Sequence, residues 1–451
     1  MLFSSYEFLF GFLPIALLAF HLSRKYLSGK SAIGVIAAFS FFFYGWWNPP
    51  YLLLLVGSIL GNFLIARWVK GRPGNARLYI GVTLNLTILG YFKYRNFFLE
   101  NIGYISGTTW EFETLLIPLA ISFFTFQQIA FLIDVKDGRA SLDNPVGYVA
   151  FVALFPQLIA GPIVLYREIG EQFEKIGAND NDFVRKFGRG LFIFAIGLFK
   201  KIALADSIAP YADTAFAKSA SLTFLEAWAA AIAYSLQLYF DFSGYSDMAV
   251  GLALMLGITL PFNFDVPFRS TSMVAFWKRW HITMTRFFMM YLYSPIALSV
   301  MRWSAASNLK GVPAFTATIA MPIIITFLLS GLWHGAAWTF VAFGGVNAIG
   351  LTVNHAWREA KLPRPPALVG WFLTMLTVVV SFVYFRANSL VDAHAILRVM
   401  FSPHELVLPN WLSGLATTFG LPCYTLDLFA SGTYTVVLDD PRSTELPVAR
   451  N

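Results

Sequence analysis

The amino-acid sequence indicates an all-α polytopic membrane protein, with about ten to twelve membrane segments around a central chamber. Only 13% of the 451 residues are charged and 57% are hydrophobic, so the chain carries more apolar surface than a water-soluble core of this size can bury. Apolar stretches of spanning length recur between charged or Pro/Gly-rich breaks. Two of them are interrupted by prolines, which indicates broken or re-entrant helices among the spans.

The composition also excludes several other classes of protein. The high share of hydrophobic residues excludes a disordered chain and a collagen-like fibre. A disulfide-stapled secreted domain is excluded because Cys423 is the single cysteine. The net charge of +7 is typical of cytoplasmic loops that orient a polytopic protein and face anionic lipid. We therefore expect a lipid bilayer as partner and no nucleic acid.

The first apolar segment is expected to be a retained span. Residues 1–22 have no basic region in front of them, and Arg24, Lys25 and Lys30 follow them. The positive-inside rule places this basic loop in the cytoplasm and the N-terminus outside. The basic loop 67–77 is expected on the same side.

The candidate membrane segments follow one another along the chain. In order, they centre on residues 7–22, 31–47, 51–69, 78–92, 115–133, 146–166, 190–209, 223–240, 247–260, 282–301, 314–333, 336–356 and 367–385. Several of the later ones are short or interrupted, so the count stays at about ten to twelve. We assign residues 1–386 to one multi-span domain. Residues 387–451 form a carboxy-terminal segment with room for one further membrane segment and a solvated tail.

Two proline-flanked stretches, FPQLIAGPI (155–163) and LPFNFDVPF (260–268), cannot be regular helix throughout. Non-helical backbone at membrane depth is tolerated where protein or a water-filled cavity satisfies its amide groups. We therefore expect both stretches to line the internal chamber.

His334 lies in the apolar sequence LLSGLWHGAAW. Gly331 and Gly335 let neighbouring backbone come close, while Trp333 and Trp338 are expected to form rigid walls. Desolvation keeps such an imidazole neutral, with one ring nitrogen free to accept a proton as a general base. The alternative is a satisfied packing residue or a haem ligand.

His281 lies in FWKRWHITMTRFF, at the expected start of a helix. Trp280 belongs to its apolar face, and Lys278, Arg279 and Arg286 supply cations. These cations suit an anionic ligand such as a cofactor pyrophosphate or the phosphate of a thioester carrier. The alternative is a basic, aromatic anchor at the membrane interface.

Several polar residues interrupt the apolar run 238–251. Asp241 and Tyr245, four positions apart, share one face if this run is helical, and Ser243 lies between them in sequence. The carboxylate can orient a histidine by accepting its second N–H, or it can form a structural ion pair with Arg279 or Arg269. Our candidates for binding substrate or donor are therefore Lys278, Arg279, Trp280, Trp333, Asp241, Ser243 and Tyr245.

No metal site and no permanently bound cofactor are predicted. A single cysteine excludes a zinc site built on several thiolates, and His21, His355, His394 and His404 have no partner at metal-ligand spacing.

Taken together, four motifs resemble the membrane-bound O-acyltransferase family, and most closely its bacterial alginate O-acetyltransferase branch. In chain order they are SFFTFQQIAFLIDVKDG, FPQLIAGPI, LQLYFDFSGYSDMAVGLALMLGITLPFNFDVPFRSTSMVAFWKRWHITMTRFF and LLSGLWHGAAW. The resemblance extends from the first span to FVYFRA near residue 385. The chain departs from the branch at Met289-Met290 and Ala297-Leu298, where an Arg-Asp pair and a Gly-Gly pair are usual.

The resemblance implies a many-helix fold around a central chamber, with the histidine of the WHG motif, His334, catalytic and that of the RWH motif, His281, nearby. It implies a cytoplasmic acyl donor, either acetyl-CoA or an acyl carrier protein, and an acceptor hydroxyl at the opposite face. The implied acceptor is a polysaccharide such as alginate or a periplasmic acetyltransferase partner protein. The implied location is the bacterial inner membrane, with the N-terminus periplasmic.

The first functional hypothesis is therefore an O-acyltransferase that O-acetylates an exported polysaccharide, with His334 as base and His281 as helper or proton relay. The alternative is a transporter or flippase whose broken helices and intramembrane Asp241 and Asp247 bind a moving substrate. Such proteins often carry inverted repeats, and none is visible in the sequence. A third hypothesis is a structural subunit of an export complex.

Overall fold

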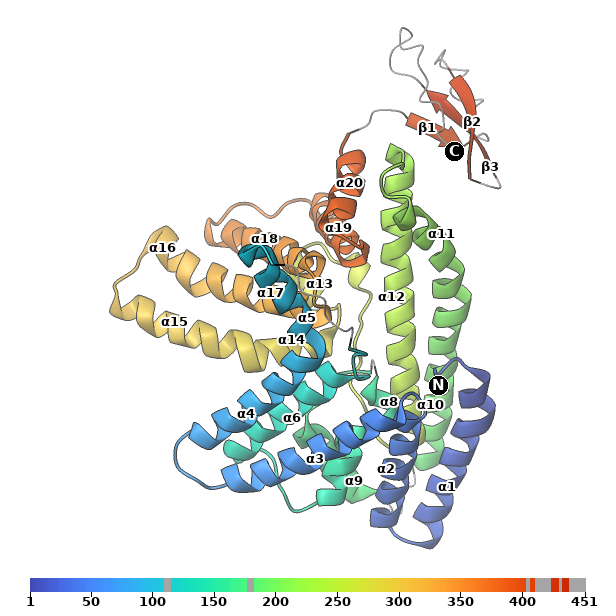
Figure 1. Ribbon diagram of the computed structural model, residues 1–451, viewed down its shortest axis with the longest axis vertical. Coiled ribbons are helices and arrows are strands. Elements are labelled where there is room, and N and C mark those ends of the chain that lie inside the picture. Colours follow the sequence, from blue (N-terminus) through green and yellow to red (C-terminus); the bar gives the residue numbers. More distant parts are fainter. Residues whose placement is uncertain are drawn as a thin grey trace.

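The computed structural model describes residues 1–108, 115–159, 161–176 and 182–402, and the backbone of three strands between residues 406 and 437. Within these residues, every regular element before residue 403 is helical, as the sequence predicts. Figure 1 shows the helices in several bundles, with the strands at one end of the molecule.

The N-terminal part forms one layer of helices. It contains a π-helical turn, Glu7–Phe12, followed by α1 (Leu13–Tyr26), α2 (Gly29–Gly45), α3 (Pro49–Val69), α4 (Ala76–Leu89), a second π-helical turn, Gly90–Tyr94, α5 (Arg95–Ser106) and α6 (Ile121–Lys136). Side-chain amides join α3 to its neighbours, because Asn62 and Asn85 exchange hydrogen bonds of 3.1 and 2.7 Å and Ser58 donates to Gln128 at 2.7 Å. These buried polar side chains thus form hydrogen bonds to one another between helices.

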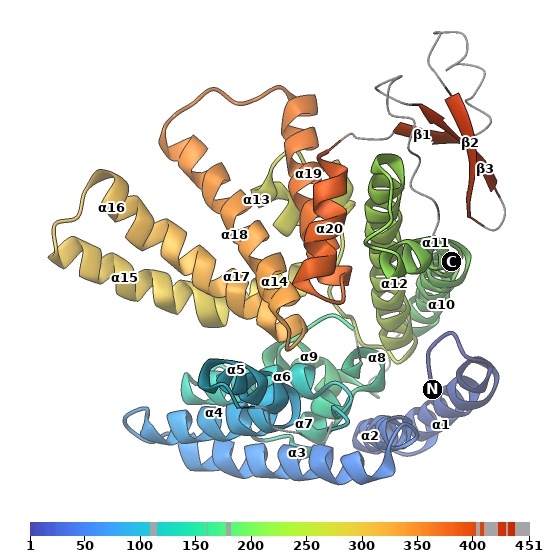
Figure 2. The ribbon, with the colours of Figure 1, turned by 45° about the horizontal axis from the view of Figure 1, so that its top comes forward.

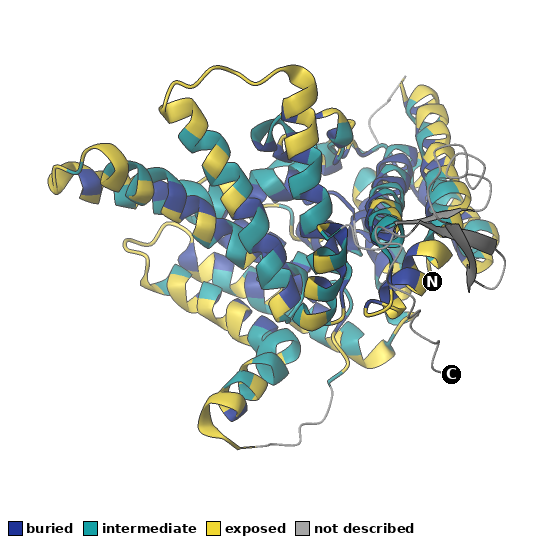
Figure 3. Cartoon of the chain, turned by 90° about the horizontal axis from the view of Figure 1, so that it is seen from above, coloured by how far each residue is buried: buried dark blue, intermediate teal, exposed yellow. Residues whose placement is uncertain are grey.

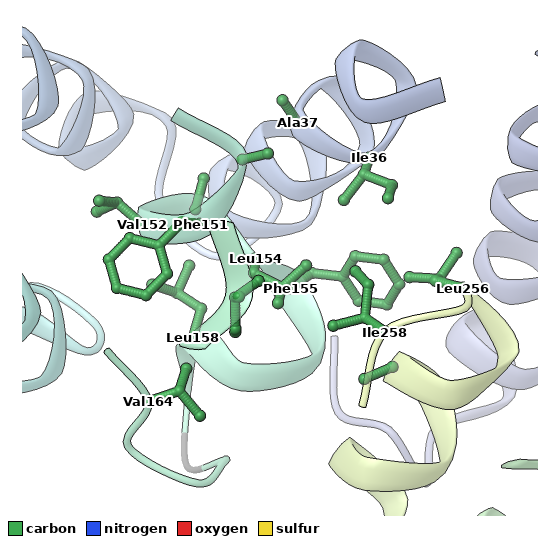
Figure 4. Close-up of a cluster of buried hydrophobic side chains, with 14 of the residues drawn as sticks. Ile36, Ala37, Phe151, Val152, Leu154, Phe155, Leu158, Val164, Leu256 and Ile258 are labelled. Atoms are coloured by element: carbon green, nitrogen blue, oxygen red, sulfur yellow. The ribbon is translucent and has the colours of Figure 1, made fainter. Parts of the chain in front are cut away.

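The predicted span 146–166 is broken, as its prolines indicate. It consists of α7 (Pro145–Ala153), α8 (Phe155–Leu158) and an extended stretch that leads into α9 (Tyr166–Lys175). Ser40 of α2 accepts the Phe155 N–H at 3.1 Å, and so satisfies backbone that the break leaves outside a helix. Figure 4 shows how Ile36, Phe155 and Ile258 then pack in one apolar core.

The two predicted segments 223–240 and 247–260 are wrong as separate spans, because one continuous helix, α12 (Phe224–Met255), contains most of both. It follows α10 (Phe183–Phe199), a π-helical turn, Lys200–Ala205, and α11 (Asp206–Ala217). The polar residues do not break α12, since Asp241 and Asp247 pair with Lys201 at 2.5 Å and Lys200 at 2.6 Å. Its 32 residues extend about 48 Å.

The second half of the chain supplies the remaining helices. They are α13 (Met273–Trp277), α14 (Ile282–Phe288), α15 (Ser294–Ala306), α16 (Gly311–Phe315), α17 (Met321–His334), α18 (Trp338–Glu359), α19 (Ala367–Arg386) and α20 (Leu390–Met400). A 3-10 turn, Pro267–Arg269, precedes α13, and π-helical turns at Met289–Tyr293 and Thr316–Ala320 connect α14 to α15 and α16 to α17. In Figure 2, α14 and α17–α19 stand above the layer of α3–α6, with α10–α12 at one side.

Four helical stretches among the described residues are long and apolar enough to cross a bilayer, namely Glu7–Tyr26, Pro49–Val69, Gly311–His334 and Ala367–Arg386. The total of ten to twelve segments stays a prediction. Large apolar side chains such as Phe10, Leu53 and Leu64 are exposed, and Figure 3 shows exposed residues on the outer faces of the helices. Such apolar exposure is what a bilayer, rather than water, would cover.

The carboxy-terminal segment contains strands, which the sequence analysis did not predict. β1 (Leu406–Pro409), β2 (Cys423–Phe429) and β3 (Gly432–Val437) form an antiparallel sheet in the order β1-β3-β2. Leu406 and Cys423 both lie opposite Val437 in this register. The predicted solvated tail lies outside the described residues.

Candidate active site

His281 and His334 line the same internal cavity, which has a volume of about 370 Å³. Residues from both halves of the chain line it. The lining residues are Lys93, Ile117, Pro118, Ala120, Ile121, Ser122, Phe123, Ile159, Leu238, Phe242, Trp280, His281, Trp333, His334, Phe343, Phe382 and Phe385. The expected chamber therefore exists, and its wall is mostly aromatic and aliphatic.

His334 is the last residue of α17, because Gly335 turns the backbone to an extended conformation. The Trp333, Phe385 and Phe343 rings surround its imidazole, with centroids 4.8, 5.1 and 5.8 Å away. The imidazole is partly accessible because it faces the cavity.

The glycines near His334 act as the sequence predicts. A Cβ atom on Gly331 would collide with the Phe340 carbonyl oxygen of α18, and one on Gly335 would collide with the Phe340 ring. Gly344 of α18 has the converse role, since its Cβ would meet the carbonyl oxygen of Phe327 on α17. These positions let α17 and α18 approach closely and so hold His334 in the wall.

His281 immediately precedes α14 and has a left-handed backbone conformation, with φ of 44°. A residue other than glycine adopts this conformation only where its surroundings enforce it. The imidazole is 1% exposed and packs edge-on against Phe242, with centroids 4.7 Å apart. The Trp333 ring lies near both imidazoles, with its centroid 6.3 Å from that of His281 and 4.8 Å from that of His334.

Asn263, which sequence reasoning missed, fixes the position of His281. It belongs to the irregular stretch 260–268, and its Oδ1 atom lies 3.1 Å from His281 Nδ1. The same oxygen accepts hydrogen bonds from the Thr283 N–H at 3.2 Å and the Thr283 hydroxyl at 3.0 Å. The Asn263 amide nitrogen donates to Ser246 on α12 at 3.2 Å. His281 Nε2 is buried and has no hydrogen-bond partner among the described residues.

The other broken stretch joins the same network. Thr283 accepts the Ile163 N–H at 2.9 Å, and the Asn263 carbonyl oxygen accepts the Ile282 N–H at 2.9 Å. The Ile163 N–H and the Asn263 carbonyl oxygen are thus satisfied, as membrane depth requires. Ile159 of the first stretch lines the cavity, but none of its described lining residues belongs to 260–268, so the prediction that both stretches line the chamber is wrong for the second, which instead positions His281 through Asn263. The sequence signal that could have identified Asn263 is its place as the polar residue between two phenylalanines in LPFNFDVPF.

Lys93 was also missed, although YFKY places a charge in a strongly aromatic sequence. It lies in the π-helical turn between α4 and α5 and lines the cavity. Its ammonium group donates to Ser122 at 3.1 Å and to the Trp333 carbonyl oxygen. Tyr94 next to it donates to the Leu332 carbonyl oxygen at 2.9 Å. Both side chains therefore bind the carboxyl end of α17, directly before His334.

The predicted binding residues separate into groups. Trp280 and Trp333 line the cavity with the histidines, whereas Lys278 lies on a different cavity. The Arg279 backbone connects to the stretch 260–268, because its carbonyl oxygen accepts the Asp265 N–H at 2.9 Å.

Asp241, Ser243 and Tyr245 do not line the histidine cavity. The prediction of an ion pair for Asp241 is confirmed but its partner was wrong. The carboxylate pairs with Lys201 rather than with an arginine, because α12 is continuous and faces the π-helical turn after α10. Tyr245 stacks on Phe3 with ring centroids 4.6 Å apart, and Ser243 is buried.

The second cavity has a volume of about 350 Å³, and its lining residues differ from those of the first. Phe288 lines it, and the Phe288 and Trp333 rings meet edge-on with centroids 6.2 Å apart, so these two rings lie between the cavities. Its basic residues are Lys278, His355 and Arg358. Three buried polar atoms in its lining residues have no partner among the described residues, namely Trp277 Nε1, Thr285 Oγ1 and Thr326 Oγ1.

Comparisons with known proteins agree with this geometry. A family model described as MBOAT, membrane-bound O-acyltransferase family, matches residues 83–391. That range contains Lys93, Asn263, His281 and His334.

Individual relatives cover most of the chain. A protein of Helicobacter pylori named peptidoglycan O-acetyltransferase is 38% identical over 89% of this chain and 80% of its own length. A Pseudomonas aeruginosa protein named probable alginate O-acetylase AlgI is 37% identical over 89% of this chain and 75% of its own length. A Streptococcus thermophilus protein named teichoic acid D-alanyltransferase is 27% identical over 62% of this chain and 70% of its own length.

Proposed function

The chain belongs to the membrane-bound O-acyltransferase family and is a multi-pass membrane acyltransferase, and we propose that it acts in the cavity lined by His281 and His334. In this proposal an acyl group passes from a thioester donor to a hydroxyl acceptor. The observation that carries it is that two histidines 53 positions apart in sequence line one largely apolar cavity.

His334 is the proposed general base. The acceptor hydroxyl attacks the thioester carbonyl carbon while a lone-pair nitrogen of His334 takes its proton. The tetrahedral intermediate then collapses, the carbon–sulfur bond breaks, and the departing thiolate takes the proton from the imidazolium. The aromatic wall formed by Trp333, Phe343 and Phe385 excludes the water that would otherwise hydrolyse the thioester.

His281 is the proposed helper. Its Nε2 atom is buried without a hydrogen-bond partner among the described residues, and the ring lines the cavity. An unpaired ring nitrogen there suits a hydrogen bond with the acceptor or a proton relay to His334.

The second cavity is the proposed donor site. Acetyl-CoA and acyl carrier proteins both present phosphate next to a pantetheine arm, and Lys278 and Arg358 are cations suited to bind phosphate oxygens. The unpaired Thr285 and Thr326 hydroxyls suit the amides of such an arm. We place the donor on the cytoplasmic side, with no permanently bound cofactor or metal.

The proposed acceptor is a hydroxyl of an exported polysaccharide, reached directly or through a periplasmic acetyltransferase partner protein. The names of the Helicobacter pylori and Pseudomonas aeruginosa relatives, one for peptidoglycan and one for alginate, support O-acetylation of a polysaccharide. We propose the bacterial inner membrane as the location, with a periplasmic N-terminus, which agrees with Arg24, Lys25 and Lys30 after the first span.

The test compares membranes that contain wild-type protein, His334→Ala or His21→Ala at equal inserted amounts. The measurement is transfer of labelled acetyl from acetyl-CoA to cell-surface glycan. We expect His334→Ala to lower the rate at least about 100-fold and His21→Ala, on α1 beside Phe183, to leave it unchanged. Full transfer by His334→Ala would refute the assigned role, and glycan export without acetylation by the wild type would favour a transporter.

A further inference from the structure

Among the described residues that line the histidine cavity, Lys93 is the one formally charged side chain. It reaches this position because the π-helical turn Gly90–Tyr94 lies between α4 and α5, beside the start of α6. A charge in the interior of a membrane protein is expensive, so it indicates a function by default.

The contacts of Lys93 leave donor capacity for a ligand. An ammonium group carries three N–H donors, and Ser122 and the Trp333 carbonyl oxygen are the two acceptors that the described residues provide. Since the side chain also lines the cavity, the remaining donor is available to a group bound there.

Its place relative to His334 is close and fixed. The Trp333 carbonyl oxygen that Lys93 binds belongs to the residue directly before His334. The nitrogen of Lys93 also lies 6.0 Å from the centroid of the Trp333 ring, which is packed against the His334 ring. A substrate carbonyl attacked beside His334 therefore lies within the neighbourhood of this ammonium group.

We propose that Lys93 binds the carbonyl oxygen of the thioester and stabilises the oxyanion of the tetrahedral intermediate. This inference rests on the proposed acyl transfer. When the acceptor oxygen bonds to the carbonyl carbon, the carbon–oxygen π electrons move to the carbonyl oxygen, and the Lys93 N–H donates to that anion. When the π bond re-forms, the carbon–sulfur bond breaks and its electrons leave with the thiolate. Lys93 keeps its proton throughout, while His334 carries the transferred one.

A purely structural role as a cap of α17 is the competing explanation. Cations and donors at the carboxyl end of a helix stabilise its unpaired carbonyl groups. Tyr94 already does so at the neighbouring Leu332 carbonyl oxygen, and Tyr94 does not line the cavity. Variants of Lys93 and of Tyr94 therefore both remove a hydrogen bond to the carboxyl end of α17. Only the Lys93 variant also removes a hydrogen-bond donor from the cavity.

The kinetic test measures acetyl transfer by wild type, Lys93→Met, Lys93→Arg and Tyr94→Phe in membranes at equal inserted amounts. We expect Lys93→Met to lower kcat about 100- to 1,000-fold, with KM for acetyl-CoA changed less than about threefold. Lys93→Arg should recover part of kcat, and Tyr94→Phe should stay within about threefold of wild type. A Lys93→Met enzyme with near wild-type kcat, or an equal loss in Tyr94→Phe, would overturn the inference.

A binding test separates this inference from the proposed function. The probe is the trifluoromethyl ketone analogue of acetyl-CoA, whose hydrate resembles the tetrahedral intermediate, and desulfo-CoA serves as the reference ligand. We expect Lys93→Met to bind the ketone at least about tenfold more weakly and the reference ligand equally well. Equal ketone affinity in wild type and Lys93→Met contradicts the role of Lys93. Failure of wild type to bind either ligand contradicts the proposed donor instead.

Discussion

Asn263 fixes the tautomer of His281. The Asn263 Oδ1 atom accepts the backbone N–H of Thr283, which can only donate, so this side of the amide is the oxygen. His281 Nδ1, 3.1 Å from the same oxygen, must therefore carry a hydrogen. Nε2 is left with a lone pair and no partner among the described residues. A side chain from the irregular stretch 260–268 thus decides which nitrogen of His281 is available for proton transfer.

Replacement of Asn263 should therefore impair the chemistry. Asn263→Ala removes the acceptor that holds the ring, and we expect kcat for acetyl transfer to fall roughly 10- to 100-fold. Ser246→Ala is the matched control, because Ser246 contacts the Asn263 amide nitrogen at 3.2 Å and not the histidine. Steady-state rates at equal protein levels provide the measurement. Equal losses in both variants would mean that the network serves only folding.

Asp241 should be dispensable for catalysis. Its pair with Lys201 is partly solvent-accessible, with side-chain exposures of 46% and 26%, and Asp206 binds the same lysine at 2.8 Å. We expect Asp241→Asn to change the transfer rate less than about twofold and to cost less than about 1 kcal/mol of stability. Rates and thermal unfolding in detergent check both numbers. A large fall in rate with normal stability would contradict this prediction and indicate that Asp241 takes part in function, as the transporter hypothesis requires.

The contact between α10 and α12 should depend on glycine. A Cβ atom on Gly197 would lie 2.5 Å from the Gly244 carbonyl oxygen, and one on Gly251 would lie 2.5 Å from the Gly190 carbonyl oxygen. Gly197→Val therefore forces the two helices apart, and we expect a loss of about 1–3 kcal/mol or more. The midpoint of thermal unfolding measures this effect. Gly188→Val tests the explanation, because a Cβ at that position of α10 meets nothing within 4 Å.

Removal of the basic residues at the second cavity should weaken binding of the donor. We expect the double variant Lys278→Ala and Arg358→Ala to raise KM for acetyl-CoA about tenfold, with kcat nearly unchanged, because these cations are proposed to bind phosphate away from the reacting carbon. Arg398→Ala, which removes an exposed cation on α20, is the control. An unchanged KM in the double variant would place the donor phosphates elsewhere.

Much of this arrangement could be predicted from local sequence. Polar groups in apolar segments are energetically expensive, and this cost identifies His281 and His334 as candidates, together with the neighbouring Trp280 and Trp333. All four residues line one cavity. The proline-flanked stretches were correctly predicted to be irregular, because proline removes a donor and blocks a helix wherever it occurs.

Other features depend on partners distant in sequence. Lys93 contacts Trp333, which is 240 positions away, and no periodicity links the two. For Asp241 the sequence predicts orientation of a histidine, substrate binding or an ion pair with Arg279 or Arg269, yet Lys201 is its partner, as Lys200 is for Asp247, and α12 is continuous. Sequence spacing shows that a polar group is expensive, but it does not identify the group that satisfies it.

The amino-acid sequence by itself determined the membrane class and the helical character of the described spans, and it made His281 and His334 candidate site residues, since these follow from composition, segment length and the chemistry of single residues. Tertiary structure alone decided that Asn263 holds His281, that Lys93 reaches the end of α17, and that Asp241 lies away from the cavity. The reason is physical: hydrogen bonds and ion pairs act over about 3–4 Å, so they form only after folding has brought remote segments together.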